Sequence, residues 1–479
     1  MMNFEANYRD LQSKMSFKDG KNGGKKGLKN QININAVFLP FVSRNPERAK
    51  FKNGFKGVLG EFARLVLDKT WDDELSADEI VKKIISEERV DCSLENEKYL
   101  EKLIADYLFD DNNDLNILKP SLFLYLPRNE NNEKKGEYEI ALFIRDVFFN
   151  KKDDFEFDEK FKDFFKDFNS NHILIKLILK SIFELPEKEI PLKYDTISNG
   201  VVNLFKEDIN FLLDKNETYL LNNMELIFAY YYFFYSSQCT LLIDKDFKGD
   251  FDGGIEPLYY ALDWESISKN RKTIKQGFNL VYDANAYLFD KCCLLSQLNT
   301  YMGVEGKLLF ELNDEFNEYG DEDKQECLKW LKKWIDDYQY VKDISTLSRN
   351  SRIDIPENVD NEFGDVVNLL SSTLYEGVDQ AVRSRYSLNI REIAKLYFLK
   401  NRGVHGSILN LTQDMFLVIT SLCIKEDKIK LNHLFGEYEK RGLFFDKYSK
   451  EKIVDLLNNL NLIDKKSDSG DAQYVKSIL

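Results

Sequence analysis

The chain has 479 residues and a formal net charge of −15, from 67 basic and 82 acidic side chains. This length excludes a single small module and allows two or three domains with substantial cores. The acidic balance excludes a protein that coats nucleic acid with its whole surface, so any such contact must be local. Hydrophobic residues make up 43% of the chain and there are only 23 glycines and 8 prolines, so we expect a mainly α-helical fold.

The first 60 residues differ from the rest, with twelve Lys and Arg against four Asp and Glu. Their first part mixes lysine with glycine, a composition that favours disorder until a partner binds. We therefore predict a basic flexible arm at residues 1–30. Its candidate DNA-binding residues are Lys21, Lys25, Lys26 and Lys29.

Residues 31–200 are predicted to form an N-terminal helical domain and residues 201–406 a central helical domain. In the first, Glu61 and Arg64 are spaced to share one helical face. An exposed ion pair is the favoured interpretation of these two residues; a buried polar contact is the alternative. In the second, the apolar run at 224–235 is shorter than the roughly 20 residues of a membrane span, which predicts a buried core helix.

No secretory signal pattern is visible at the polar, basic start of the chain, so we expect a cytoplasmic protein with no membrane partner. The six cysteines are scattered without zinc-ligand spacing and are expected to be reduced, buried thiols.

A second basic stretch lies at 383–402, where six basic residues accompany one acid, Glu392. In so acidic a chain this concentration indicates a local site for an anionic partner. The candidate DNA-binding residues there are Arg383, Arg385, Arg391, Lys395, Lys400 and Arg402.

The C-terminal segment, 407–479, is predicted to be a winged-helix-like domain. Thr412 is a plausible N-cap for a first helix, 427–431 can form a short strand, and Gly442 would end a second helix. A third helix is expected to begin with Ser449 as its N-cap and to bury Ile453, Leu456, Leu457 and Leu460. The segments on either side of the polar turn at 467–471 predict a hairpin, the wing.

The charges of this segment do not favour ordinary reading of the DNA major groove. On a helical wheel, the outer face of the third helix carries Glu451, Lys452, Asp455, Asn458 and Asn459, and its two acids oppose phosphate contact. Residues 407–479 contain eleven basic and eleven acidic side chains. Only Lys465 and Lys466 in the wing are added as DNA-binding candidates.

The sequence shows no recognisable catalytic motif. The histidines His172, His405 and His433 are far apart, and the acidic loop at 244–254 lacks the acids that an EF-hand needs at its fifth and twelfth positions. We therefore expect no metal and no cofactor. Carboxylate-based nuclease sites have spacings too loose to be excluded, so a metal-dependent nuclease subunit remains an alternative, as does a sequence-specific regulator that uses the third helix.

Several segments at both ends of the chain resemble the DptG family of bacterial DNA phosphorothioation-dependent restriction systems. Near the C-terminus these are 401–403, 409–412, 440–446 and 467–476, and near the N-terminus 38–41 and 57–64. The resemblance implies a protein that acts with DptF and the ATPase-like DptH against DNA lacking the sulfur modification, as antiviral defence. It supplies no catalytic residue. The leading hypothesis is a non-catalytic restriction subunit that contributes double-stranded DNA binding, subunit docking or both.

Overall fold

A computed structural model describes most of the chain, and the mainly α-helical prediction is confirmed. The described residues are 3–14, 17–18, 27–28, 35–44, 47–73, 75–91, 93–128, 133–149, 155–168, 170–182, 184–251, 254–346, 362–465 and 473–479. The strands among them are short, from two to five residues long.

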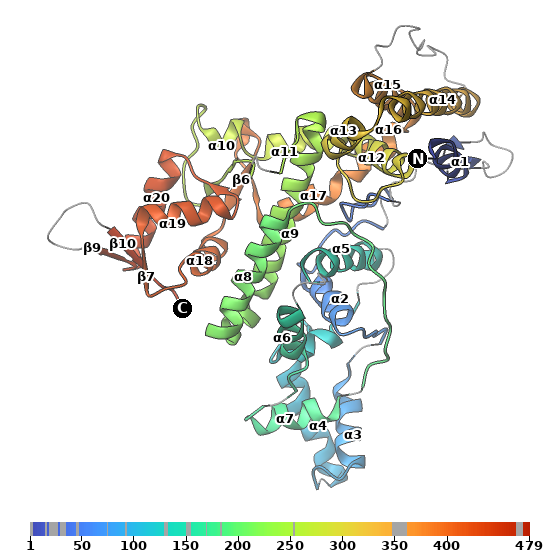
Figure 1. Ribbon diagram of the computed structural model, residues 1–479. Helices are drawn as coiled ribbons and strands as arrows, with labels where there is room; N and C mark the ends of the chain where they lie inside the picture. Colours follow the sequence, from blue (N-terminus) through green and yellow to red (C-terminus); the bar gives the residue numbers. More distant parts are fainter. Residues whose placement is uncertain are drawn as a thin grey trace.

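Helix α9 (Glu217–Asp244) lies at the centre, where three lobes meet (Figure 1). It contacts α8 (Asn199–Lys215), α11 (Phe278–Ala284), α12 (Leu288–Met302), α17 (Leu388–Tyr397) and α18 (Gln413–Cys423). By length and composition α9 could cross a membrane, but 83% of its most apolar window is buried inside the protein. The aromatic run at 224–235 is therefore a core helix, as predicted.

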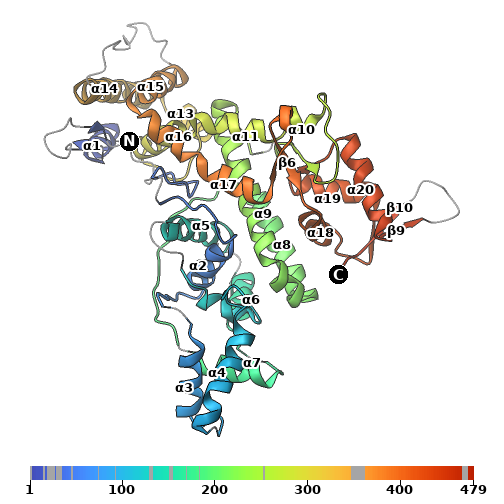
Figure 2. The ribbon, with the colours of Figure 1, turned by 180° about the vertical axis from the view of Figure 1, so that it is seen from behind.

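The N-terminal lobe extends away from α9 (Figures 1 and 2). Its elements are α2 (Lys56–Val66), α3 (Ala77–Ser86), α4 (Leu94–Leu108), η3 (Pro120–Tyr125), α5 (Glu133–Phe148), α6 (Phe155–Phe165) and α7 (Ile173–Ser181). Helix α2 packs on α5, and Phe62 of α2 meets Phe149 and Phe228 in a core of buried rings. The predicted domain boundary at 200/201 falls inside α8, so α8 continues from this lobe into the centre.

The upper lobe contains the N-terminal helix and a later part of the chain. Its elements are α1 (Phe4–Lys14), η5 (Asn285–Tyr287), α12, α13 (Leu309–Glu318), α14 (Asp321–Thr346), α15 (Phe363–Gly377) and α16 (Gln380–Tyr386). Helix α1 packs against α12 and α14 and buries Phe4, Tyr8 and Leu11, with the Tyr8 ring 5.1 Å from that of Trp330. Residues 4–14 are therefore a docked helix and not part of a flexible arm. The short strands β1 (Phe17–Lys18) and β2 (Gly27–Leu28) pair after it.

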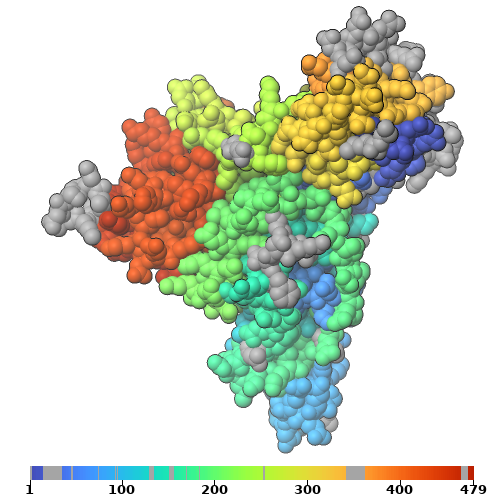
Figure 3. Space-filling view, in the orientation of Figure 1, coloured from blue at the N-terminus to red at the C-terminus, as the bar shows by residue number. Residues whose placement is uncertain are grey.

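The C-terminal lobe combines the last part of the chain with a piece of the middle. The middle contributes β3 (Leu258–Tyr259), β4 (Ala261–Leu262) and α10 (Lys272–Lys275). The end of the chain contributes β5 (Leu399–Asn401), η6 (Gly403–His405), β6 (Ser407–Leu411), α18, β7 (Lys428–Lys430), α19 (Leu431–Lys440), β8 (Leu443–Phe444), α20 (Lys447–Asn459), β9 (Ile463–Lys465) and β10 (Gln473–Lys476). In the space-filling view this lobe stands apart from the other two (Figure 3).

The helices of this lobe begin and end near the predicted positions. Thr412 caps α18 by accepting a hydrogen bond from the Met415 amide, and Gly442 follows α19 with φ 75°. Helix α20 differs from the prediction, because its N-cap is Asp446, whose carboxylate accepts from the Ser449 amide (3.1 Å). Leu460, predicted to be buried, is 38% exposed because it lies beyond the last turn of α20.

Two small sheets decide how the C-terminal lobe is assembled. Strands β7, β10 and β9 form one antiparallel sheet in that order, with Val475 opposite both Ile429 and Ile463. In the other, β6 pairs with β5 on one side and with β4 on the other. Strand β3 also pairs with β8. The predicted boundary at 406/407 therefore separates two paired strands, β5 and β6, and leaves out the contribution of residues 258–275.

Candidate functional site

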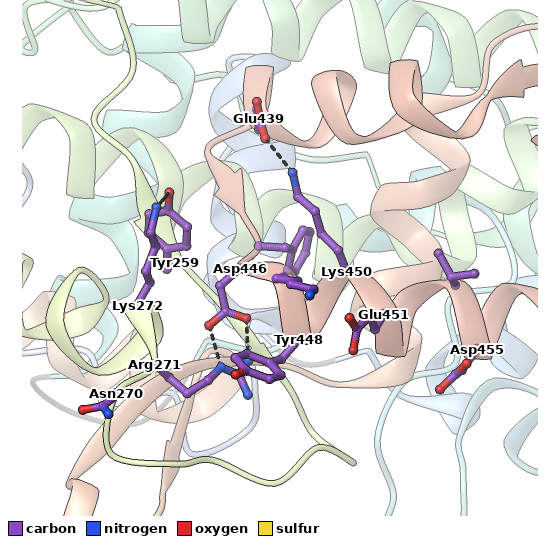
Figure 4. A pocket seen from close by; sticks show the side chains of 13 residues that line it. Tyr259, Asn270, Arg271, Lys272, Glu439, Asp446, Tyr448, Lys450, Glu451 and Asp455 are labelled. Carbon is purple, nitrogen blue, oxygen red and sulfur yellow. Dashed lines mark hydrogen bonds and ion pairs between the residues drawn. The ribbon is translucent and has the colours of Figure 1, made fainter. Parts of the chain in front are cut away.

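An open cleft lies between the segment that follows β3 and the start of α20 (Figure 4). Its volume is about 820 Å³. One wall comes from the middle of the chain and the other from the C-terminal segment. The lining residues are Tyr259, Asn270, Arg271, Lys272, Glu439, Phe445, Asp446, Lys447, Tyr448, Lys450, Glu451, Val454 and Asp455.

A buried arginine joins the two walls of this cleft. Arg271 is 3% exposed and donates to both carboxylate oxygens of Asp446, from Nε to Oδ2 (2.5 Å) and from Nη2 to Oδ1 (2.8 Å). Its Nη2 also lies 2.9 Å from the hydroxyl of Ser449 and 3.3 Å from both oxygens of Glu265. Asp446 thus acts twice, as the N-cap of α20 and as the main partner of Arg271.

Glu265 completes the polar cluster from the other side. Its Oε1 accepts from the Leu262 amide (2.9 Å) and from the hydroxyl of Ser449 (2.8 Å). Burial alone lowers the pKa of Arg271, but Asp446 and Glu265 outweigh that effect and raise the pKa above its ordinary value. Arg271 is therefore a permanently charged structural residue. Breaking such a buried pair by removing one partner costs about 3–5 kcal/mol.

The outer face of α20 agrees with the helical wheel. Glu451, Lys452, Asp455, Asn458 and Asn459 are all exposed, while Ile453 and Leu457 are fully buried. Lys452 contacts Asp455 (3.0 Å) within the face, so its charge is partly neutralised. The face that would enter a DNA groove thus presents two acids, two amides and one paired lysine.

The basic stretch at 383–402 is largely committed to contacts within the protein. Arg383 donates to Asp290 (2.5 and 3.0 Å) and lies 4.0 Å from the centre of the Tyr375 ring. Lys400 forms an ion pair with Asp263. Arg402 donates to the backbone carbonyls of Glu265 (3.1 Å) and Leu262 (2.9 Å) and to the side-chain oxygen of Asn410 (2.9 Å).

These contacts correct the prediction for half of the stretch, because buried or half-buried side chains already bound to protein oxygens are poor ligands for phosphate. Arg385, Arg391 and Lys395 are exposed, and Lys395 lies 4.0 Å from Glu392. They remain candidates for contact with DNA.

The other predicted basic residues lie beyond what the structure describes. Lys21, Lys25, Lys26, Lys29 and Lys466 fall in undescribed segments. Lys465 is the last residue of β9, but its side chain is outside the described part.

The favoured interpretation of Glu61 and Arg64 as an exposed ion pair is wrong. Arg64 is 1% exposed and Glu61 3%, and the guanidinium donates to the carbonyls of Leu124 (2.9 Å) and Leu126 (3.0 Å). The Glu61 carboxylate is shared between Arg64 and Arg128. Leu124 lies in the last turn of η3 and Leu126 is its C-cap, so both carbonyls are at a helix end, where carbonyls lack partners within the helix.

A further buried pair fixes the C-terminal lobe to the centre. Arg441, at the end of α19, donates to both oxygens of Asp208 on α8 (2.8 and 2.6 Å), and both side chains are fully buried. Tyr231 of α9 donates to the same carboxylate (2.5 Å), and Lys425 lies 3.0 Å from it. The sequence hides this pair, since its members are 233 residues apart.

The described residues contain no group of side chains suited to a metal ion, since no three His, Cys, Asp or Glu side chains among them are grouped so that they could hold one. In the acidic loop at 244–254, Asp244 and Asp246 both form ion pairs with Lys291 (2.9 and 2.8 Å). The five cysteines that the structure describes are unpaired and buried, and burial raises the pKa of each, to about 12 for Cys292, Cys327 and Cys423.

The wall of the cleft that Asn270, Arg271 and Lys272 form is not among the sites predicted from the sequence. Its signal was present in the sequence, since residues 266–282 contain Lys269, Arg271, Lys272 and Lys275 and no acidic residue.

Comparison with known proteins gives no independent assignment: no protein-family model matches the chain, and no curated protein matches it significantly. Function is therefore inferred from the residues and their geometry.

Proposed function

We propose that this chain is a non-catalytic, cytoplasmic subunit of a bacterial DNA phosphorothioation-dependent restriction complex, of the kind that the DptG-like segments indicate. Within that complex its C-terminal lobe would be a winged-helix module that serves mainly as a docking element. The observation that carries the proposal is the topology of that lobe. Three helices, α18, α19 and α20, are combined with the antiparallel sheet β7-β10-β9, in which the strand between the first two helices pairs with the C-terminal hairpin.

This order of elements supports the winged-helix assignment, in which α20 would take the place of the recognition helix and β9–β10 would be the wing. The charges favour docking over reading of the major groove. The outer face of α20 has two exposed acids, Glu451 and Asp455, which a phosphate backbone would repel. Protein partners tolerate such a face when it meets complementary basic residues.

The fixed position of the module also supports a docking role. The Arg441–Asp208 and Arg271–Asp446 pairs hold α19 and α20 to α8 and to residues 258–275. A partner bound to the module is thereby held at a constant position relative to the other two lobes. A module that searched DNA independently would need a flexible tether instead.

Co-purification tests the proposal directly. The tagged full-length chain is expected to retain DptF and DptH in low salt, and its deletion is expected to abolish restriction of unmodified DNA in cells. A variant with Glu451→Lys and Asp455→Lys should lose a partner, whereas Glu95→Lys with Glu101→Lys on α4 should not. Failure of the unaltered chain to retain either protein would overturn the proposal.

The same preparation separates the two alternatives. A metal-dependent nuclease predicts cleavage of DNA by the purified chain with Mg²⁺ or Mn²⁺, abolished by one carboxylate substitution. A sequence-specific regulator predicts that Asn458→Ala and Asn459→Ala remove the preference for one DNA sequence.

A further inference from the structure

Residues 269–275, on the side of the cleft that Asn270, Arg271 and Lys272 line, carry three lysines that form no ion pair with a described residue. Lys269, Lys272 and Lys275 are exposed, and Lys447 at the first turn of α20 is exposed on the opposite wall. Among the described residues, none of the four forms an ion pair. The Lys272 amine instead donates to the hydroxyl of Tyr259 (3.0 Å). These four lysines are called the lysine strip below.

The strip has a fixed shape because Arg271 anchors its centre. Arg271 points inward to Asp446, Glu265 and Ser449, while its neighbours Asn270 and Lys272 are exposed (Figure 4). Arg271, Asp446 and Glu265 therefore pair with one another inside the buried cluster. The charged side chains that remain exposed between residues 266 and 276 are all lysines, and Arg271 holds this segment against the N-terminal turn of α20.

We propose that the lysine strip binds the phosphate backbone of DNA, and this inference rests on the proposed function. Lysines and amides that lack a protein partner are typical phosphate ligands, which give affinity without sequence preference. Lysine is depleted from the centres of protein interfaces, so an acidic protein partner fits this surface less well. The strip also explains how a winged-helix module with an acidic outer face can lie next to DNA.

The acidic residues at the other end of the cleft limit where DNA can contact α20. Glu451 and Asp455 lie farther along α20, on the other side of the cleft from Lys272 and Asn270 (Figure 4). Glu439 is engaged by Lys450 (3.3 Å). A DNA strand bound to the strip is attracted at the start of α20 and repelled by its middle, so the helix contacts the backbone with its first turn and does not enter the groove.

The test measures binding of the full-length chain to a short DNA duplex of mixed sequence by fluorescence anisotropy, at several salt concentrations. The variant carries Lys269→Glu, Lys272→Glu and Lys275→Glu. The matched control carries Lys98→Glu, Lys102→Glu and Lys188→Glu, three exposed lysines of the N-terminal lobe. The strip variant is expected to bind about tenfold or more weakly, with a salt dependence smaller by about three counterions, whereas the control changes little.

A second variant is expected to bind DNA more tightly than the unaltered chain. Glu451→Gln with Asp455→Asn removes two negative charges beside the strip and is expected to strengthen binding in the same assay. Folding of every variant is checked by circular dichroism and thermal unfolding, and the milder Lys→Gln versions serve if charge reversal perturbs the fold.

Equal DNA affinity of the strip variant and the control, or no binding by the unaltered chain at low salt, would overturn the inference. Loss of DptF or DptH with unchanged DNA affinity would also overturn it, because the strip would then be a protein interface. The proposed function fails separately, when the unaltered chain retains neither partner, and this outcome does not depend on DNA affinity.

Discussion

Arg64 in the N-terminal lobe and Arg441 in the C-terminal lobe are both fully buried, but their charges are balanced by different kinds of partner. Arg64 is held by two backbone carbonyls and by a glutamate that it shares with Arg128. Arg441 faces an aspartate through two parallel bonds and has a second acid, Glu437, at 2.9 Å. The first arrangement holds a segment within one lobe, whereas the second joins the C-terminal lobe to the central helix α8.

The pKa values of the two arginines are shifted in opposite directions. Burial lowers the pKa of Arg64 by more than Glu61 restores, and the nearby positive charge of Arg128 lowers it further. Burial also opposes the charge of Arg441, but Cys423 and Asp208 raise its pKa well above the ordinary value. Removal of Arg441 would leave the buried Asp208 carboxylate with Lys425 alone as a counter-charge, and Lys425 is shared with Glu207. After removal of Arg64, Glu61 would still be paired with Arg128.

The largest effect is expected for Arg441→Met. Asp208 is fully buried and would retain only Lys425 and the Tyr231 hydroxyl, so the contact between α8 and the end of α19 should weaken by about 3–5 kcal/mol. Hydrogen exchange monitored by mass spectrometry should show faster exchange in α8, α18 and α19. The N-terminal lobe, which does not contact Arg441, serves as the internal control; unchanged exchange at α19 would contradict the prediction.

Arg64→Met should have a smaller effect, about 1–3 kcal/mol, because Glu61 keeps Arg128 as its partner. The loss comes from the carbonyls of Leu124 and Leu126, which lose their donor inside the core. Faster exchange should be confined to η3 and α2. An equal loss of stability in Arg64→Met and Arg441→Met would contradict this prediction. The backbone carbonyls that bind Arg64 would then contribute as much to stability as the buried Asp208.

Much of the C-terminal lobe could be predicted from local sequence, because caps and apolar spacing are local properties. Thr412 and Gly442 act where the sequence indicates, and the segments β9 and β10 pair as predicted. Asp446 was missed as the N-cap of α20 because Ser449 has equal intrinsic preference for a cap. What decides between them is Arg271, 175 residues earlier, which fixes the Asp446 carboxylate.

The candidate site could be predicted less well, for the same reason. Spacing shows which residues share a helical face, but it does not show which charges are neutralised by distant ones. Arg383, Arg402 and Lys400 contribute to a basic stretch in sequence, yet each binds oxygens of residues 262–290 in space. Lys269, Lys272 and Lys275 were overlooked, although no described acid pairs with them.

The smallest change in stability is expected at Asp72, an exposed residue that contacts Arg128 at the edge of the Arg64 cluster. A hydrogen bond from Lys134 and then one from Arg128 lower the pKa of Asp72 to about 2, against the opposing effect of partial burial.

A carboxyl group whose pKa is lower in the folded state stabilises the fold above its unfolded pKa, near 3.8, and this contribution is lost as pH falls through the folded pKa, about 2. Because the Asp72 side chain is 65% exposed, the contribution is screened and small. Asp72→Asn should therefore lower the thermal unfolding temperature slightly at pH 6 and by less at pH 2, as measured by differential scanning fluorimetry. Asp111→Asn, an exposed aspartate without a described partner, is the matched control; an equal shift at both pH values would show that Asp72 acts through packing and not through its charge.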